Sequence, residues 1–335
     1  MIDSNKMDKI DLTVVMYHYV RDLKNSRYPA IKGLQTELFK GQIEFLKKNY
    51  NFVKVEDVIN AFHGNAELPP HSVLLTFDDA YSDHFNTVFP ILYNEGIQGA
   101  FYPPVKAVTE HTVLDVNKIH FILASINDGD MNKLINEIKI QLNEFRSEYN
   151  LETFEYYFEK LAIANRFDPK EVIFVKRLLQ VELPEKLRNI ITNKLFNKIV
   201  GIEESAFSRE LYMSLDQIKT MVKCGMHIGS HGYDHYWLGS FPWGKQEFEI
   251  QKSVEFISEV GGDINNWSIC YPYGNYNQDT LDILQKNGCR LGLTTQVATI
   301  SGSSIDNSLY IYTLPRLDTN DLPKDISASV NKWYK

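Results

Sequence analysis

The sequence predicts an α/β fold built on a parallel sheet, and three observations support this prediction. Residues 72–77 form a nearly continuous apolar run, which is typical of a strand buried on both faces of a parallel sheet. A similar run, 14–20, lies near the start of the chain, and a shorter strand-like segment covers 226–229. Further stretches of the chain have apolar residues at helical spacing. In such folds the functional side chains gather at the carboxyl ends of the strands.

The helices expected around these strands have recognisable sequence limits. Gly288 stands in the capping position after the last of them, where a residue with a left-handed backbone commonly ends a helix. The expected ranges are 35–49, 55–62, a helix beginning near Ser82, 243–260 and 277–287.

Two adjacent carboxylates, Asp78 and Asp79, follow the buried strand 72–77. Because side chains alternate along a strand, these two are expected to point in different directions. One carboxylate could then bind a metal while the other faces a substrate. Alternatively, the pair caps the helix that begins near Ser82.

A second polar motif, Ser-His-Gly-Tyr-Asp-His, covers residues 230–235 and follows the strand-like segment 226–229. His231 and His235 would share one face of a helical turn, and a tight loop could also bring them together. Imidazole nitrogens suit zinc and the neighbouring divalent metals. Two histidines and one carboxylate leave coordination positions open, which is typical of a catalytic metal. Without the acid pair, such a histidine pair would indicate only a surface feature.

The ordered set of motifs resembles the NodB-homology polysaccharide deacetylases, carbohydrate esterase family 4. In motif style it is most similar to the branch that deacetylates poly-N-acetylglucosamine. The resemblance covers about residues 10–105 and 210–318 and implies a distorted (β/α) barrel of the polysaccharide deacetylase type. The segments that carry it are 76–79, 81–83, 89–92, 99–102, 231–235, 271–274 and 291–295.

The resemblance also implies a function and a set of site residues. It implies a metal-dependent hydrolase that removes an acetyl group from an amino sugar or a saccharide that contains one. Asp79, His231 and His235 would bind a divalent metal, with zinc expected and cobalt or nickel as alternatives. Asp78 would act as the general base, and the backbone N–H of Tyr273 would stabilise the oxyanion.

The sequence departs from the family pattern at the residue that pairs with the base. Many members have an arginine a few residues before the tyrosine of the third motif, whereas Cys270 stands at this place here. Arg316 is a candidate replacement, because it follows a late strand-like segment. The alternative for Arg316 is an ordinary ion pair at the surface or between loops.

The second departure from the family pattern concerns the general acid. Many members use a histidine from a late motif, but no histidine follows His235 in this chain. His18, at the end of the first strand, is the best candidate to protonate the leaving amine. His84 and His120 are weaker candidates, and a packed, hydrogen-bonded role for His18 is the alternative.

Composition restricts the partners and the compartment. The formal net charge of −8 argues against nucleic acid or an anionic membrane surface as the main partner. Residues 1–11 are polar and do not resemble a secretory signal, and no segment is apolar for long enough to span a membrane. Three cysteines without metal-type spacing fit a reducing compartment. We therefore expect a cytoplasmic protein, and such a location would favour a small amino-sugar substrate.

Residues 106–210 do not fit the barrel pattern. This segment has apolar residues at helical spacing and contains no glycine between 131 and 200. We therefore expect a barrel domain formed by 1–105 and 211–335, interrupted by a helical insertion, 106–210. The insertion could cover the site as a lid or form the contact of a homo-oligomer.

Two other functions remain open from the sequence. The chain could hydrolyse another acyl group, such as a formyl group, an O-acetyl ester or a cyclic amide. It could also be an inactive relative that binds carbohydrate without hydrolysing it.

Overall fold

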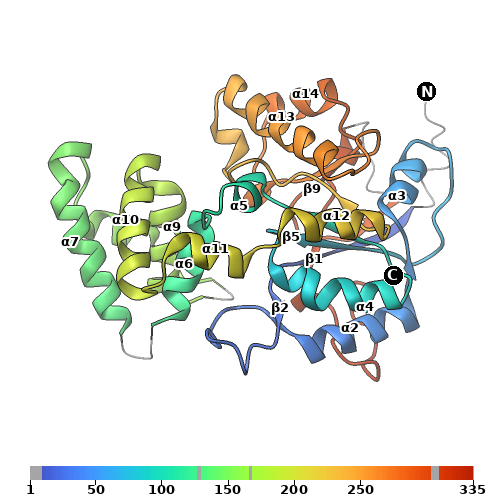
Figure 1. Cartoon of the computed structure of the whole chain (residues 1–335), viewed down its shortest axis with the longest axis horizontal. Helices are drawn as coiled ribbons and strands as arrows, with labels where there is room; N and C mark the ends of the chain where they lie inside the picture. The colour runs from blue at the N-terminus through green and yellow to red at the C-terminus, as the bar shows by residue number, and fades with distance from the viewer. Residues whose placement is uncertain (1–9, 127–129, 166–167, 303–308, 335) are drawn as a thin grey trace. The chain divides into compact units, whose positions relative to one another are not determined.

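The computed structural model describes residues 10–126, 130–165, 168–302 and 309–334 (Figure 1). Contacts between residues divide the chain into two compact units. The first unit comprises the described residues within 1–22, 33–112 and 208–335, and the second comprises those within 23–32 and 113–207. The short segment 23–32 thus groups with the helices of the second unit.

Strands occur in the first unit, and most of them are short. The longest two are β1 and β5, of seven residues each. The strands are β1 (Asp11–Tyr17), β2 (Val20–Arg21), β3 (Leu34–Gln35), β4 (Asn51–Phe52), β5 (Ser72–Asp78), β6 (Gly99–Tyr102), β7 (His227–Ile228), β8 (Ser268–Cys270), β9 (Leu291–Leu293), β10 (Ile300–Ser301) and β11 (Leu317–Asp318).

Parallel pairing connects the main strands into a ring. β1 pairs with β5, β5 with β6, and β6 with β7. A single bridge between Ser230 and Ile269 leads to β8, which pairs with β9. A second bridge, between Leu293 and Leu314, leads to the segment that continues into β11, and β11 pairs with β1. The predicted α/β class is confirmed; in the described residues, two junctions of the ring are single bridges rather than continuous ladders.

Strand β5 illustrates how alternation builds the core and the site together. Its side chains are all buried, as the apolar run predicts. Val73, Leu75 and Phe77 belong to the apolar cluster that also contains residues of the surrounding helices. Leu74 belongs to a second cluster with residues of β1, β6, β8 and β9. Asp78 has the same parity as Leu74, so it ends the strand on the face of the second cluster.

Helices of the first unit lie outside the strands, and Figure 1 shows α2, α4 and α12 running beside β1 and β5. Their buried residues contribute to the same apolar cluster as the outward side chains of β5. These elements are α2 (Thr36–Asn49), α3 (Val55–Phe62), the π-helical turn η1 (His84–Val88), α4 (Phe89–Asn94), α5 (Val105–Thr109), α12 (Leu215–Lys223), α13 (Trp243–Glu259) and α14 (Gln278–Lys286), with the 3₁₀ turns η3 (Leu238–Ser240), η4 (Pro272–Gly274), η6 (Tyr310–Tyr312) and η7 (Thr319–Asp321).

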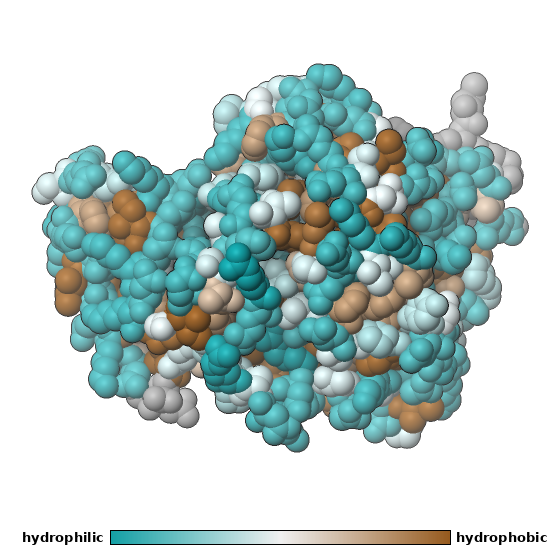
Figure 2. Space-filling view, viewed as in Figure 1, coloured by the Kyte–Doolittle hydropathy of each residue, from teal (hydrophilic) through white to brown (hydrophobic). Residues whose placement is uncertain are grey.

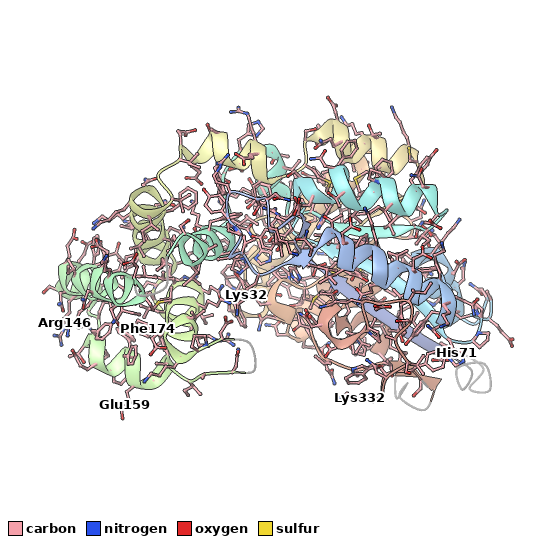
Figure 3. All side chains as sticks on the ribbon, turned by 90° about the horizontal axis from the view of Figure 1, so that it is seen from below. Lys32, His71, Arg146, Glu159, Phe174 and Lys332 are labelled. Carbon is pink, nitrogen blue, oxygen red and sulfur yellow. The ribbon has the colours of Figure 1, made fainter. Side chains whose placement is uncertain are left out.

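In the residues that the structure describes, the regular secondary structure of the second unit is helical, and the segment 23–32 is a loop. The core of this unit includes Phe174 of α9, which packs against Phe154 and Phe158 of α8. In Figure 3, Arg146 and Glu159 lie at the outer edge of this unit. The helices are α6 (Asp115–Ala124), α7 (Met131–Tyr149), α8 (Phe154–Leu161), α9 (Lys170–Arg177), η2 (Leu178–Glu182), α10 (Glu185–Ile199) and α11 (Glu204–Leu211), the last turn of which belongs to the first unit.

Polar residues cover most of the face shown in Figure 2, with smaller apolar areas scattered among them. Among the described helices, none combines the length and the apolar character that crossing a membrane would require.

Candidate active site

The turn after β5 directs the two carboxylates to different partners. Asp79 and Ala80 have positive φ angles of 77° and 58°, a region that costs a non-glycine residue about 1–3 kcal/mol. Asp78 faces Arg316, whereas Asp79 faces the two histidines of the 230–235 motif. The following helix begins at Ser82 and continues into the π-helical turn η1. The carboxylate oxygens bond Arg316 and Tyr81 or have no partner, and none accepts from the backbone at the start of this helix. The alternative that the acid pair is a helix cap is therefore wrong.

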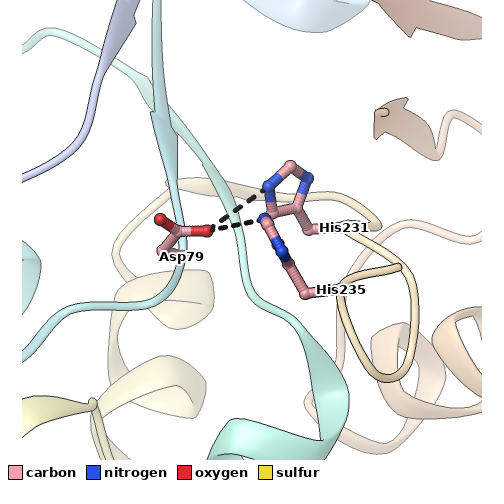
Figure 4. A group of neighbouring side chains, drawn as sticks. All are labelled: Asp79, His231 and His235. Carbon is pink, nitrogen blue, oxygen red and sulfur yellow. Dashed lines mark ion pairs between the residues drawn. The ribbon is translucent and has the colours of Figure 1, made fainter. Parts of the chain in front are cut away.

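Asp79 faces both His231 and His235, whose rings lie beside each other (Figure 4). Its Oδ1 is 3.4 Å from Nε2 of His231 and 3.3 Å from Nε2 of His235. Its Oδ2 accepts a hydrogen bond of 2.7 Å from the hydroxyl of Tyr81, which is fully buried. Oδ1 itself is buried and has no hydrogen-bond partner among the described residues.

This arrangement fits a divalent cation. Burial alone would raise the pKa of Asp79, but the two neighbouring imidazoles outweigh it and hold this pKa well below its usual range. The carboxylate is therefore ionised, and the three potential ligand atoms lie within 4.8 Å of one another. An unsatisfied carboxylate oxygen beside two imidazole nitrogens is a donor set that suits zinc and its neighbours.

The loop that carries the histidines is irregular, and contacts outside it set the orientation of His231. Gly232 and His235 have positive φ angles of 73° and 56°, so the motif forms a tight loop and not a helical turn. Nδ1 of His231 donates a hydrogen bond of 2.6 Å to the carbonyl oxygen of Cys270. Since a carbonyl can only accept, Nδ1 carries a proton, and Nε2 is the ring nitrogen that faces Asp79. Nδ1 of His235 is buried without such a partner in the described structure.

Arg316 binds Asp78 with both ends of its guanidinium group. The two N–O distances are 2.9 and 2.8 Å, and Arg316 is only 1% exposed, which excludes a surface ion pair. Burial raises the pKa of Asp78, but the charges of Arg316 and His231 outweigh it and lower this pKa to about 2. Arg316 also lies 3.1 Å from Sγ of Cys270, the residue that occupies the expected arginine position. The arginine thus reaches the same carboxylate from a later part of the chain.

Because Tyr17 of β1 pairs in parallel with Phe77 of β5, His18 lies close to the acid pair at the same end of the sheet. Its carbonyl oxygen accepts a hydrogen bond of 2.9 Å from Nε2 of His84. His84 is fully buried, and burial lowers its pKa to about 4. His84 is therefore neutral and supports the end of β1, so it does not fit an acid. His120 is on α6 in the helical unit and lines a pocket there.

Tyr273 lies beside the histidine loop in a strained turn. Its φ angle is 58°, and the following residue, Gly274, has a φ of 69°. A Cβ at Gly274 would come within 2.2 Å of the Thr295 hydroxyl, so only glycine fits there. The Tyr273 ring meets the ring of His235 edge-on at 4.8 Å and stacks on Trp237 at 4.7 Å. This packing holds Tyr273 next to the two histidines.

Sequence reasoning did not predict the contacts of several residues that shape the site. Tyr81 was recognised only as part of a family segment, although a tyrosine two residues after a carboxylate can reach it across a tight turn. Trp237 follows the second histidine closely, and the spacing alone did not show that it stacks on Tyr273. Glu249 lies fourteen residues beyond the motif on α13, and no local pattern connects it with the histidine loop.

Comparisons with known proteins agree with this geometry. Residues 195–292 match the family model described as polysaccharide deacetylase. The Bacillus subtilis protein YxkH is 30% identical over 99 residues, which are 30% of this chain and 34% of YxkH. The poly-β-1,6-N-acetyl-D-glucosamine N-deacetylase of Escherichia coli K12 is 32% identical over 80 residues, or 23% of this chain and 12% of that protein. The matched region is thus a minor part of both relatives.

Solved structures show the same fold over nearly the whole chain. The Streptococcus pyogenes deacetylase PplD, in complex with acetate, aligns with a TM-score of 0.54 and 17% identity over 92% of both chains. IcaB from Ammonifex degensii aligns with a TM-score of 0.53 and 18% identity, over 92% of this chain and 91% of IcaB. These similarities confirm the deacetylase-type fold predicted from the sequence. The family-model match over residues 195–292 agrees with the resemblance of the ordered motifs to the NodB-homology polysaccharide deacetylases.

Proposed function

We propose that the chain is a metal-dependent N-deacetylase that removes an acetyl group from an amino sugar or from a saccharide that contains one. The observation that carries this proposal is the buried, ionised Asp79 that faces His231 and His235, beside an Asp78 held by Arg316. The match to an N-deacetylase of an N-acetylglucosamine polymer supports the substrate class.

Asp79, His231 and His235 would hold the divalent metal, for which zinc is the proposed identity and cobalt or nickel the alternatives. When bound there, such a cation supplies Lewis acidity to the acetyl carbonyl and to the attacking water. Tyr81 holds Oδ2 of Asp79, so that Oδ1 is the atom turned toward the histidines.

Asp78 acts as the general base in this proposal. It is ionised at neutral pH, and each of its oxygens retains a lone pair beside its bond to Arg316. Asp78 therefore accepts a proton as the water attacks the acetyl carbon. The bidentate contact with Arg316 keeps the carboxylate in one orientation during this step.

His18 and Tyr273 complete the reaction. His18, which follows β1 beside the acid pair, gives a proton to the amine as the C–N bond breaks, so that acetate and the free amino sugar leave. The backbone N–H of Tyr273, in its strained turn, stabilises the negative charge on the carbonyl oxygen in the tetrahedral intermediate.

The proposal also covers the helical insertion and the location of the protein. Residues 106–210 are proposed as a helical insertion within the barrel, with oligomer formation as one of its possible roles. A cytoplasmic location, and with it a small substrate, stays a prediction that cell fractionation would test.

The test is acetate release from N-acetylated amino sugars in free, nucleotide-linked and oligomeric form. The purified chain is stripped with a chelator and assayed with and without added zinc, cobalt or nickel. We expect release that depends on metal, no turnover for Asp78→Asn with metal retained, and loss of metal for His231→Ala. Wild-type turnover by Asp78→Asn would refute the assigned base.

Other outcomes would favour the alternative functions. Metal binding without acetate release from any substrate, but with release of formate or cleavage of an O-acetyl ester or cyclic amide, would indicate a different acyl group. Saccharide binding without any hydrolysis would indicate an inactive relative.

A further inference from the structure

The loop between the two histidines, residues 232–234, is held by contacts made to its backbone. It connects the two histidines of the site. Gly232 has a positive φ angle, and so does His235, the residue that follows the loop. A loop of this shape has few hydrogen bonds of its own, so its conformation depends on the groups packed around it.

Glu249 of α13 provides two of these contacts from a single atom. Its Oε2 accepts hydrogen bonds from the backbone N–H of Tyr233 at 2.7 Å and of Asp234 at 3.0 Å. The same oxygen would lie 3.3 Å from a Cβ at Gly232, which shows how closely the carboxylate approaches the loop. Glu249 is 1% exposed, so these bonds are made away from water.

The start of α5 holds the loop from another direction. The backbone N–H groups of Val105 and Lys106 donate to the carbonyl oxygens of Gly232 and Tyr233, at 3.2 and 2.9 Å. The ammonium group of Lys106 also bonds Asp234 at 2.5 Å. Together, Glu249 and the start of α5 bond both N–H groups and carbonyl oxygens of the loop backbone.

A buried carboxylate is expensive unless its bonds compensate for the lost hydration. In the described residues, the Glu249 carboxylate accepts hydrogen bonds from backbone N–H groups of the histidine loop. A charged acceptor binds such N–H groups about twice as strongly as a neutral one. Its hydrogen bonds to the histidine loop therefore explain why the Glu249 carboxylate is buried at this position.

We propose that Glu249 is a positioning residue for the metal site. Its carboxylate fixes the backbone between His231 and His235, so that both imidazoles face Asp79 before a metal binds. This inference rests on the proposed function, because it takes the two histidines as metal ligands. Glu249 itself touches neither the metal nor the substrate; it acts through the loop.

The test compares zinc affinity in the purified full chain for wild type, Glu249→Ala and Glu249→Gln. Affinity is measured by competition with a chromophoric chelator, together with the absorption spectrum of the cobalt-substituted protein. Groups that orient metal ligands typically change metal affinity by 10–100-fold when they are removed. We expect a loss of about 10–100-fold for Glu249→Ala. The glutamine carbonyl keeps a neutral acceptor, so we expect a loss of about 3–10-fold for Glu249→Gln.

Glu247→Gln is the matched control, because Glu247 lies on the same helix and bonds Lys286 at the surface. It should bind zinc like the wild type. Circular dichroism of the metal-free proteins separates folding from metal binding. A changed cobalt spectrum in Glu249→Ala, with the helical signal retained, would support positioning of the ligands.

Wild-type zinc affinity in folded Glu249→Ala would overturn the inference, even if its melting temperature fell. If Glu249→Ala does not fold, wild-type affinity in Glu249→Gln would overturn it instead. A wild-type chain that binds no zinc, cobalt or nickel would refute the proposed metal site itself, so the two failures are distinguishable.

Discussion

Replacing Arg316 by methionine removes the charge that holds Asp78 while keeping much of the side-chain volume. Arg316 makes two bonds to Asp78 and one each to the Thr294 carbonyl, the Thr76 hydroxyl and Cys270 Sγ. All of these are buried, so the variant leaves an uncompensated carboxylate in the core. Removal of one partner from a buried ion pair typically costs about 3–5 kcal/mol.

This cost is large enough to measure by thermal unfolding. At about 2–4 °C per kcal/mol for a domain of 150–250 residues, Arg316→Met should lower Tm by about 6–20 °C. The metal-free protein is the appropriate sample, because a bound cation would add its own stabilisation. Arg209→Met, a change at an exposed arginine, is the control and should leave Tm nearly unchanged.

The double variant Asp78→Asn/Arg316→Met separates the charge from the packing. Because it removes both charges, it should recover a large part of the Tm lost in Arg316→Met. If Arg316→Met melted within about 2 °C of the wild type, or if the double variant were no more stable than Arg316→Met, the reasoning about a buried, mutually dependent pair would be refuted.

Three further predictions concern single side chains. His18→Ala should lower the rate of acetate release by about 10²-fold or more with metal content unchanged; a rate within a fewfold of wild type would remove His18 from the mechanism. Tyr81→Phe removes the donor to Asp79 and should weaken zinc binding about 10-fold or more in chelator competition, and unchanged affinity would contradict this role. The imidazole of His227, 3.7 Å from the Glu56 carboxylate, lowers the pKa of Glu56 to about 2, below its usual value. This carboxylate therefore stabilises the fold above pH 4.5 and less as the pH falls toward 2. Glu56→Gln should therefore lower Tm by a few degrees at pH 6 and by less at pH 3, because a partly exposed pair contributes about 0–1 kcal/mol to stability. An equal loss of Tm at both pH values would contradict this prediction.

The parts of the site that follow from strand geometry were predictable from the sequence. The apolar run before Asp78 predicted a buried strand, and alternation predicted that Asp78 and Asp79 would face different partners. The absence of an arginine at Cys270 led to Arg316 as a candidate, and the two residues are in contact in the structure. Parallel strands bring their carboxyl ends together, so a side chain from a late strand can replace one from an earlier strand.

The rest depended on backbone shapes and contacts that no short sequence pattern encodes. The histidine spacing was compatible with a helical turn as well as a loop, and only the positive φ angles of Gly232 and His235 distinguish them. Glu249 acts through backbone N–H groups, which every residue except proline possesses, so the loop sequence carries no sign of it. A composition-based argument also could not place the segment 23–32 with the helices of the second unit.

Backbone strain gives independent support for the location of the functional site. Seven described non-glycine residues have positive φ angles, and four of them belong to the site: Asp79, Ala80, His235 and Tyr273. At about 1–3 kcal/mol each, this strain is comparable with the net stability of a whole domain. It persists only because surrounding bonds over-determine the backbone, as the hydroxyl of Tyr81 does at Asp79 and the stacked ring of Trp237 does at Tyr273. Strain of this size has no advantage for folding. Its concentration around one ionised carboxylate therefore supports the proposal that the metal-binding and oxyanion-stabilising groups are in place before the substrate arrives.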